Sequence, residues 1–339
     1  MTEVRRPPAM RDVAHLAGVS HQTVSRVVND HPNVRSETRE RVLAAMRKLD
    51  YQPNAAARTL ATNRSQTIGL VTFDTTLFGP SFMVHAIERA AREAGFFVSI
   101  ASARELDVAS VREAIRRLRE QSVEGIVTLA PVAAAWTALG QVPLDVPIVA
   151  VGIDGDSHPE VPMVAVDNAA GAALATRHLI ELGHPTVYHV AGPADWPEAR
   201  EREAGWRAAL EDAGRPVPAP LPGDWSAQSG HAAGLRLAAD PSVTAVFCGN
   251  DQMAIGMLRA LHEAGRTVPR DVSVVGFDDV PEAPYLQPPL TTVRQDFAEL
   301  GRDSLNLLVT QISTGVRRTG QHRSAPSLVV RHSTKALAQ

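Results

Sequence analysis

The polar side chains of residues 20–26 have the types and the spacing that suit contact with DNA. Val24, Val27 and Val28 share one face of a helix in this stretch. Four polar residues are left to point outward at or near the N-terminal end of that helix: His21, Gln22, Ser25 and Arg26. Amide and guanidinium groups can form paired hydrogen bonds with the edges of DNA bases. The pattern predicts a helix that lies in a DNA major groove.

Two short helices joined by a glycine turn are expected over residues 11–30, and this is the helix-turn-helix arrangement. Gly18 ends the first helix where a left-handed backbone costs least. Ser20 caps the second helix by accepting a hydrogen bond from the amide of Gln22 or Thr23. A third helix is expected over 36–49, capped by Ser36. Its packing side chains are expected to be Val42, Leu43, Met46 and Leu49.

The charge distribution separates this helical segment from the rest of the chain. Residues 1–64 hold eleven Lys and Arg against six acids, a net charge of +5, whereas the whole chain is −3, so the remainder carries −8. A basic head on an acidic body is typical of a separate phosphate-binding module. The charge therefore favours DNA binding over the alternative of two ordinary surface helices in a larger α domain.

Composition and length limit the remaining possibilities. A chain of 339 residues is expected to form two or three domains. No apolar run is long enough to cross a bilayer and the first residues lack the pattern of a signal peptide, so we expect a cytoplasmic protein without membrane contact. Cys248, the sole cysteine, is expected to be a packed strand residue. The histidines lack metal-ligand spacing, and we expect no metal and no cofactor.

From Thr67 onward, strands alternate with amphipathic helices, which predicts parallel sheets in two α/β subdomains. The expected strands are 68–73, 97–101, 125–129, 148–151, 164–166, 187–191, 243–248 and 272–277. The expected helices are 82–94, 108–121, 168–182, 199–213, 227–239, 251–264 and 296–314. Ligands of such folds bind beyond the carboxyl ends of the strands, here in the cleft between the subdomains.

Several motifs, in order, resemble the LacI/GalR family of transcriptional repressors over almost the whole chain. They include Gln22-Thr-Val-Ser-Arg-Val-Val-Asn29, Tyr51-Gln-Pro-Asn54, Asn250-Asp-Gln-Met-Ala254 and Asp271-Val-Ser-Val-Val-Gly-Phe-Asp-Asp279. The resemblance implies a helix-turn-helix headpiece (1–53), a hinge helix and linker (54–66) and a two-lobed core like that of periplasmic sugar-binding proteins (67–339). It also implies a homodimer that reads two half-sites of a near-palindromic operator.

The resemblance assigns the DNA contacts residue by residue. His21, Gln22 and Arg26 are expected at base edges, where Arg26 suits guanine and Gln22 suits adenine or another base edge. The expected phosphate contacts are Ser20, Thr23, Ser25, Asn29 and Thr38. Hinge contacts are expected from Asn54, Ala57 and Leu60, with Leu60 wedged into the minor groove. The alternative for Leu60 is a contact with the hinge of the dimer mate.

The same resemblance implies a sugar-binding cleft. Its lining on one lobe is expected to be Arg202, Trp225, Asn250 and Asp278, with Phe297 from a crossover. The other lobe is expected to contribute Phe73, Leu77, Gly79, Pro80 and Met83. Guanidinium, carboxylate and amide groups pair with sugar hydroxyls, and an indole offers a flat face to a pyranose ring. Without the resemblance, Trp225 would be assigned to the core, Arg202 to the surface and Asp278 to a helix cap.

Two departures from a sugar-binding member of the family leave the sugar open. Gly152 stands where that member has an aspartate, and Asp154 lies two residues further on. Near Val166 an aromatic position is lost. We expect a repressor of carbohydrate-utilisation genes that a β-galactoside or another β-glycoside releases from its operator. The alternatives are a co-repressor ligand or, less favoured, a sugar-binding transport protein.

An enzymatic role is not expected. Asp278 and Asp279 are adjacent and should diverge, and the glycine-rich stretches lack the spacing of a phosphate-binding fingerprint. The last residues carry no leucine heptads, so a dimer is expected in preference to a tetramer.

Overall fold

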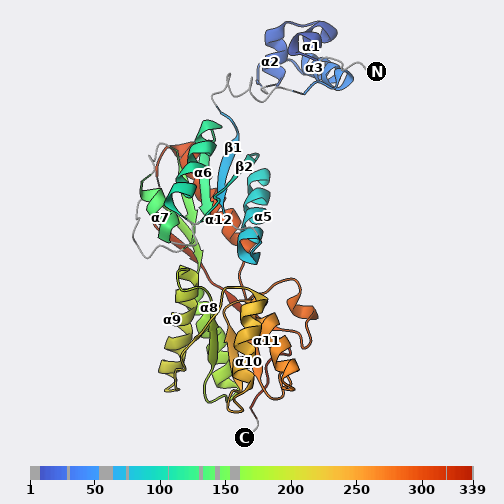
Figure 1. Cartoon of the computed structure of the whole chain (residues 1–339). Helices are drawn as coiled ribbons and strands as arrows, with labels where there is room; N and C mark the ends of the chain where they lie inside the picture. Colours follow the sequence, from blue (N-terminus) through green and yellow to red (C-terminus); the bar gives the residue numbers. More distant parts are fainter. Residues whose placement is uncertain are drawn as a thin grey trace, which may run out of the picture. The chain divides into compact units, whose positions relative to one another are not determined.

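The structure is a computed structural model that describes residues 8–28, 31–52, 64–73, 76–105, 107–129, 133–141, 146–152, 161–317 and 319–337. The chain divides into two units, Met1–Ser65 and Gln66–Gln339, which are called the headpiece and the core (Figure 1). The headpiece is helical, and the core contains two six-stranded sheets with helices packed on them. This combination confirms the fold class that the sequence predicts.

Three helices form the headpiece: α1 (Met10–Ala17), α2 (His21–Val28) and α3 (Ser36–Leu49). Val13, Val24 and Val42 are fully buried where the three helices meet. Gly18 ends α1 with φ 62° and ψ 38°, as predicted. The hydroxyl of Ser20 accepts the amide of Thr23 at 3.1 Å, which confirms the predicted cap of α2.

Two details of α3 differ from the prediction. Ser36 is its first helical residue, and Arg35 occupies the cap position without a side-chain hydrogen bond. Leu43 is 38% exposed, and Ala45 takes its place in the headpiece core at 5% exposure. The two residues lie on different sides of the helix because the buried row runs from Val42 through Ala45 at a spacing of three. Tyr51, which follows the end of α3, is buried there as well.

The first sheet of the core, with its helices, is called the N-lobe and lies within residues 67–166 and 297–324. Its strands lie in the order β11 (Gln321–Ser324), β5 (Met163–Val166), β4 (Ile148–Val151), β3 (Gly125–Leu129), β1 (Thr67–Thr72) and β2 (Phe97–Ser102). All pairs in it are parallel. One hydrophobic cluster joins the sheet to α5 (Phe78–Glu93) and α12 (Phe297–Thr314). Another joins it to α6 (Val108–Glu120) and α7 (Ala133–Gly140).

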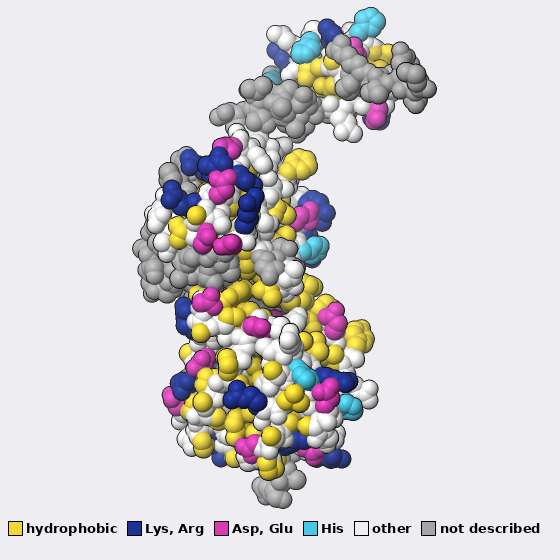
Figure 2. Space-filling model, viewed as in Figure 1, with side chains coloured by type: hydrophobic (Ala, Val, Ile, Leu, Met, Phe, Trp, Pro, Cys, Tyr) yellow, Lys and Arg dark blue, Asp and Glu magenta, His cyan; other side chains and the backbone are white. Residues whose placement is uncertain are grey.

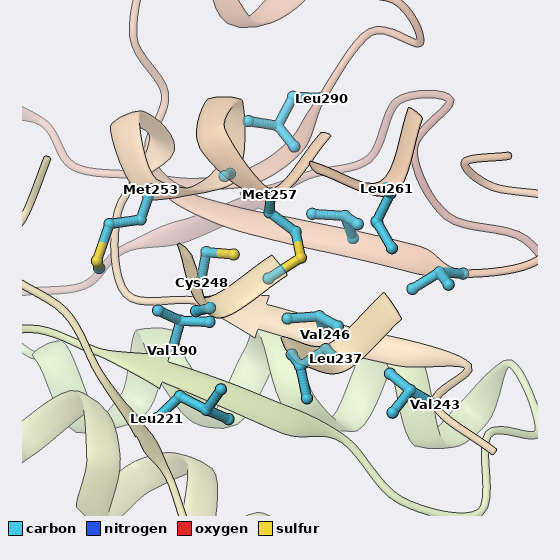
Figure 3. Close-up of a cluster of buried hydrophobic side chains, with 14 of the residues drawn as sticks. Val190, Leu221, Leu237, Val243, Val246, Cys248, Met253, Met257, Leu261 and Leu290 are labelled. Atoms are coloured by element: carbon cyan, nitrogen blue, oxygen red, sulfur yellow. The ribbon is translucent and has the colours of Figure 1, made fainter. Parts of the chain in front are cut away.

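The second sheet, with its helices, is called the C-lobe and lies within residues 167–296 and 327–337. Its strands lie in the order β12 (Ser327–Val329), β10 (Thr291–Arg294), β9 (Ser273–Asp278), β8 (Ala245–Cys248), β6 (Tyr188–Ala191) and β7 (Leu221–Pro222). The helices α8 (Asn168–Glu181) and α9 (Pro197–Asp212) pack in one cluster with it. The helices α10 (Ala227–Ala238) and α11 (Asp251–Glu263) pack in another (Figure 3).

Figure 3 shows Cys248 among apolar side chains of this last cluster, with Met253 and Met257 of α11 nearby. Its side chain is fully buried, as predicted for a packed strand residue. Burial raises the pKa of the Cys248 thiol above its usual range, and Asp251 adds to this effect. The thiol is therefore a packing group at neutral pH.

The chain passes between the two lobes at three places, after β5, after β10 and after β11. Asp167 caps α8 at the first crossing by accepting the amide of Ala170 at 2.8 Å. Asp296 caps α12 at the second by accepting the amide of Glu299 at 2.8 Å. The helix caps thus fix the chain where it changes lobes.

Six short elements among the described residues were not predicted. They are α7, β7, β10, β11, β12 and a 3₁₀ turn at Ala283–Tyr285. β12 pairs antiparallel with β10, so the C-lobe sheet is not wholly parallel. These strands are two to four residues long and are held by distant partners, so local periodicity carries too little signal to find them.

Candidate functional site

The predicted base-contacting side chains lie on the surface of the headpiece. His21, Gln22 and Arg26 are all exposed on α2. They are free to reach a ligand because the helix is held by its other face, through Val24 and Val27. An exposed amide and guanidinium on the first turns of one helix can meet the edges of consecutive base pairs.

The predicted phosphate contacts flank this surface. Ser20 is exposed, whereas Thr23, Ser25 and Thr38 are partly buried. The hydroxyls of Ser20 and Thr23 are 2.9 Å apart and form a hydrogen bond. Of the remaining predicted DNA contacts, Asn29, Asn54, Ala57 and Leu60 lie outside the described residues, as does most of the predicted hinge.

A cavity of about 650 Å³ lies in the core and is lined by residues of both lobes. The structure brings together there all ten residues expected to bind an effector: Phe73, Leu77, Gly79, Pro80, Met83, Arg202, Trp225, Asn250, Asp278 and Phe297. Figure 2 shows hydrophobic side chains gathered where the two lobes adjoin. The cavity combines these apolar walls with a few buried polar groups, which is the usual make-up of a small-molecule site.

Arg202 and Asp278 form a buried charged pair in this cavity. Their side chains are 7% and 8% exposed, and Nη1 of Arg202 lies 3.6 Å from Oδ1 of Asp278. The Arg202 Nε also donates to Oδ1 of Asn168 at 2.8 Å, and its Nη1 donates to the carbonyl of Gly249. Burial raises the pKa of Asp278 to about 6, while Arg202 acts in the opposite direction. Arg202 is thus held rigidly, and neither residue is a surface charge or a helix cap.

Asn250 serves the fold and the cavity together. Its Oδ1 accepts the amide of Met253 at 2.9 Å and so caps α11. Its Nδ2 donates to the carbonyl of Trp225 at 3.0 Å and to Oε1 of Gln252 at 3.1 Å. Both amide protons are therefore used, and the second lone pair of Oδ1 remains to accept a ligand hydroxyl.

The ring of Trp225 packs directly on the backbone of Gly192, where a larger residue would collide with it. A Cβ at Gly192 would lie 2.2 Å from Cη2 of Trp225, closer than any real contact. The ring meets Trp196 edge-on at 5.8 Å between centroids, and Arg202 lies 5.3 Å from the Trp225 centroid. Trp225 is 7% exposed, so it is packed on several sides and lines the cavity with the surface that remains.

The N-lobe wall of the cavity comes mainly from the start of α5 and from the residues just before it, with Phe73 directly after β1. Phe73 and Met83 belong to the N-lobe cluster that also contains α12. Leu77 and Phe78, in contrast, pack against the hydrophobic cluster of the C-lobe. A ligand in this cavity therefore meets side chains that already link the two lobes.

Two families of known proteins match the chain, one over the headpiece and one over part of the core. Residues 9–54 match the family of bacterial regulatory proteins called lacI, and residues 176–334 match the periplasmic binding protein-like domain. Over 338 residues the chain is 37% identical to the lactose operon repressor of Escherichia coli K12, covering 98% of this chain and 92% of that repressor. The chain belongs to the lacI family. It is a DNA-binding transcriptional repressor regulated by a small-molecule effector.

This lacI-family repressor is also similar to a second repressor and to two solved complexes with small molecules. It is 32% identical over 341 residues to the transcriptional repressor PurR of Haemophilus influenzae Rd, covering 97% of this chain and 99% of that one. Its structure resembles that of a lac repressor dimer bound to operator and the anti-inducer ONPF, with a TM-score of 0.89, 37% identity and coverage of 98% and 100%. It also resembles a complex of the regulator CelR with cellobiose, with a TM-score of 0.72, 34% identity and coverage of 96% and 99%.

Some cavity residues of this lacI-family repressor were missed by sequence reasoning. They include Phe78, Phe82, Asn168, Trp196, Glu198 and Gln295. Gln295 donates its Nε2 to Oδ1 of Asp278 at 2.5 Å, from the second crossing between lobes. Burial raises the pKa of Glu198 to about 7, and its Oε2 has no hydrogen-bond partner among the described residues. The available signal was the spacing of four between Glu198 and the predicted Arg202, which puts both side chains on one face of α9.

The two departures noted in the sequence lie at this site. Gly152 and Val166 line the cavity, and Gly152 has φ 139°. A side chain at Gly152 would be strained by that backbone conformation, which keeps this part of the wall open. Asp154 lies outside the described residues.

Over the described residues, no helix is both long and apolar enough to cross a membrane. No group of three or more potential metal-ligating side chains is found in the same part of the chain.

Proposed function

We propose that this lacI-family repressor controls carbohydrate-utilisation genes in the cytoplasm and that a sugar, most simply a β-glycoside, releases it from its operator. The observation that carries this proposal is the cavity between the lobes. It places a guanidinium (Arg202), a carboxylate (Asp278) and an amide oxygen (Asn250) beside the ring of Trp225. Adjacent sugar hydroxyls are donors and acceptors together, and the C–H face of a pyranose packs on an indole.

The operator is proposed to be near-palindromic and to be read by a homodimer. His21, Gln22 and Arg26 are the proposed base contacts, and Ser20, Thr23, Ser25, Asn29 and Thr38 the proposed phosphate contacts. Asn54, Ala57 and Leu60 are proposed as hinge contacts near the operator centre. An exposed edge strand supports the dimer, since Phe97 and Ile100 of β2 are 70% and 51% exposed at the end of the N-lobe sheet. Light scattering at micromolar concentration is expected to show a dimer, and a tetramer would contradict it.

Induction is proposed to act through the contacts between lobes. Leu77 and Phe78 pack on the C-lobe, and Gln295 ties Asp278 to the second crossing, so a sugar that rearranges these contacts shifts one lobe against the other. Such a shift lowers operator affinity only if the sugar binds the two states differently, which is typically worth about 1–3 kcal/mol. An enzymatic role is not part of the proposal. General acid–base catalysis would need a second carboxylate to act with Asp278. The neighbouring carboxylate, Asp279, is instead held in ion pairs with Arg294 and Arg331.

A screen of sugars tests this proposal. Thermal unfolding of the purified protein is measured with β-galactosides, β-glucosides and cellobiose, and each hit is tested for release of the DNA beside its own gene. A sugar that raises the melting temperature and releases the DNA is expected. Stabilisation with tighter DNA binding would make the ligand a co-repressor, the alternative that the relative PurR keeps open. Absence of DNA binding at low salt would favour a transport protein.

A further inference from the structure

An ion pair joins the two lobes where α9 approaches β11. Nη1 of Arg323, in the N-lobe strand β11, donates to Oε1 of Glu201, in the C-lobe helix α9, at 2.9 Å. The two side chains are 34% and 22% exposed, so the pair is partly shielded from water. Gln321 of the same strand accepts a hydrogen bond from Nε of Arg323 at 3.4 Å and so helps to hold the guanidinium. The pair is a direct charged contact between elements of different lobes.

The ion pair lies away from the edge of the N-lobe that is proposed for the dimer. In the N-lobe sheet β11 is the first strand and β2 is the last, so the two strands occupy opposite edges. A partner chain that contacts Phe97 and Ile100 of β2 therefore lies on the other side of the sheet from Arg323.

Glu201 and its neighbour Arg202 connect α9 to the three crossings between the lobes. Arg202 donates to Asn168, directly after the first crossing, at 2.8 Å. It also lies 3.6 Å from Asp278, whose carboxylate accepts a hydrogen bond from the second crossing. Glu201 pairs with Arg323, just before the third crossing. The start of α9 is thus attached to every described connection between the lobes.

The same part of α9 also touches the effector cavity. Arg202 lines the cavity from the C-lobe. On the N-lobe side, Arg323 lies opposite Ala165 in the pairing of β11 with β5, and Ala165 lines the cavity as well. Since adjacent residues of a helix move together, a ligand that displaces Arg202 also displaces Glu201 relative to Arg323. Contiguous contacts of this kind can couple two sites.

The surroundings of Glu201 make it depend on its partner. Its Oε2 is buried and has no hydrogen-bond partner among the described residues. A buried carboxylate oxygen without a partner is costly, and the cation at the other oxygen offsets part of this cost. Separation of the lobes at this point would remove that cation. The ion pair therefore opposes such a separation.

We propose that Glu201 and Arg323 form a latch that holds the two lobes in the arrangement seen here and through which α9 transmits a change in the cavity to the N-lobe. The latch concerns the repressor with any effector, so it does not depend on the proposed sugar. A partly exposed ion pair shifts an equilibrium between two arrangements by up to about fivefold. Because the headpiece is followed in the chain by β1 of the N-lobe, operator affinity is expected to respond to this shift.

Electron spin resonance between two labels measures the arrangement of the lobes without any ligand. The labels are attached at Ala109→Cys in α6 and Ala208→Cys in α9, which are exposed positions in different lobes. Only these positions react, because the natural Cys248 is fully buried. Labelled chains are diluted with unlabelled ones, so that only distances within one chain are measured. The protein with Glu201 and Arg323 intact is expected to give one narrow distribution of distances.

Loss of the latch is expected to broaden or shift this distribution. Glu201→Gln and Arg323→Gln should each do so, and about 1 M KCl should act in the same direction by screening the charges. The double variant should match the single variants, because all three lose the same interaction. Operator affinity, measured by fluorescence anisotropy, is expected to change by about two- to fivefold in these variants.

The control is Glu203→Gln, which removes an acid of the same helix whose partner, Arg207, also belongs to α9. It is expected to change neither the distances nor the operator affinity. Thermal unfolding confirms that each variant is folded. Unchanged distances in the single variants, an equally broad distribution with the pair intact, or an equal change in the control would overturn the latch.

Altered distances with unchanged operator affinity would overturn the effect of the latch on DNA binding. No sugar is used in these measurements, so a failure of the proposed β-glycoside function would appear only in the sugar screen and is distinguished from a failure of the latch.

Discussion

The headpiece and the core expose their functional side chains in opposite ways. On α2, the predicted base contacts lie within six residues of one another and are exposed. In the cavity, Arg202 and Asp278 are separated by 76 residues in sequence, lie 3.6 Å apart and are almost fully buried. The headpiece surface therefore depends on local helix geometry, whereas the cavity depends on the packing of a whole lobe. Substitution of the exposed base contacts should alter DNA binding alone, whereas substitution of the buried cavity residues should alter stability and ligand binding together.

Replacement of Arg202 should have the largest effect. Arg202→Met leaves Asp278 buried without its cation and removes the donors to Asn168 and Gly249. Removal of one partner of a buried pair costs about 3–5 kcal/mol, so the free energy of unfolding in urea is expected to fall by that amount. Arg207→Met is the control, because Arg207 lies on the same helix, is 43% exposed and pairs with Glu203. It should cost at most about 1 kcal/mol, and equal losses would contradict the structural role of Arg202.

Replacement of Arg26 should alter DNA binding without altering stability. Arg26→Ala removes an exposed guanidinium, and a paired contact to a base is worth about 1–3 kcal/mol. Operator affinity, measured by fluorescence anisotropy, is expected to fall by about 10- to 100-fold, with little change on scrambled DNA. The free energy of unfolding should stay within about 0.5 kcal/mol of the wild-type value. Equal weakening on both DNAs would instead identify Arg26 as a phosphate contact.

Glu198 should make the stability of the core depend on pH. Its pKa is raised from 4.5 to about 7 by burial, so the folded state holds the proton more tightly than the unfolded chain between these values. The stability that this proton contributes is lost as the pH rises through that window. We therefore compare the free energy of unfolding of Glu198→Gln with that of the wild type at pH 5 and at pH 8. The difference should shift in favour of the variant by about 1–2 kcal/mol at pH 8, after allowance for partial exposure. An unchanged difference between the two pH values would contradict it.

The smallest effect is expected at the cap of α2. Ser20→Ala removes the hydrogen bond to the amide of Thr23 and should cost about 1 kcal/mol of headpiece stability. Faster hydrogen exchange of the Thr23 amide would report this loss. Ser36→Ala is the control, because α3 begins without a side-chain cap. A larger effect at Ser36 than at Ser20 would reverse the assignment of the caps.

The sequence predicted local features well and distant ones incompletely. The turn at Gly18 and the cap at Ser20 follow from neighbouring residues, and the structure confirms both. Strands β10 to β12 escaped prediction because partners far along the chain hold them. The resemblance to the family assigned Arg202, Trp225 and Asp278 to the cavity. The contact of Trp225 with Gly192 and the hydrogen bond of Arg202 to Asn168 arise only in the folded lobe. Glu198 and Phe82 were missed for the same reason.

The most direct test of induction measures the linkage between the two regions in reverse. Calorimetric titration of the inducing sugar is performed on the free protein and on the protein saturated with operator DNA. Because coupling is reciprocal, the operator should weaken sugar binding by the same factor by which the sugar weakens operator binding, typically about 5- to 150-fold. Unchanged sugar affinity would show that the cavity and the headpiece are not coupled. Tighter sugar binding on the operator would show a co-repressor and contradict induction.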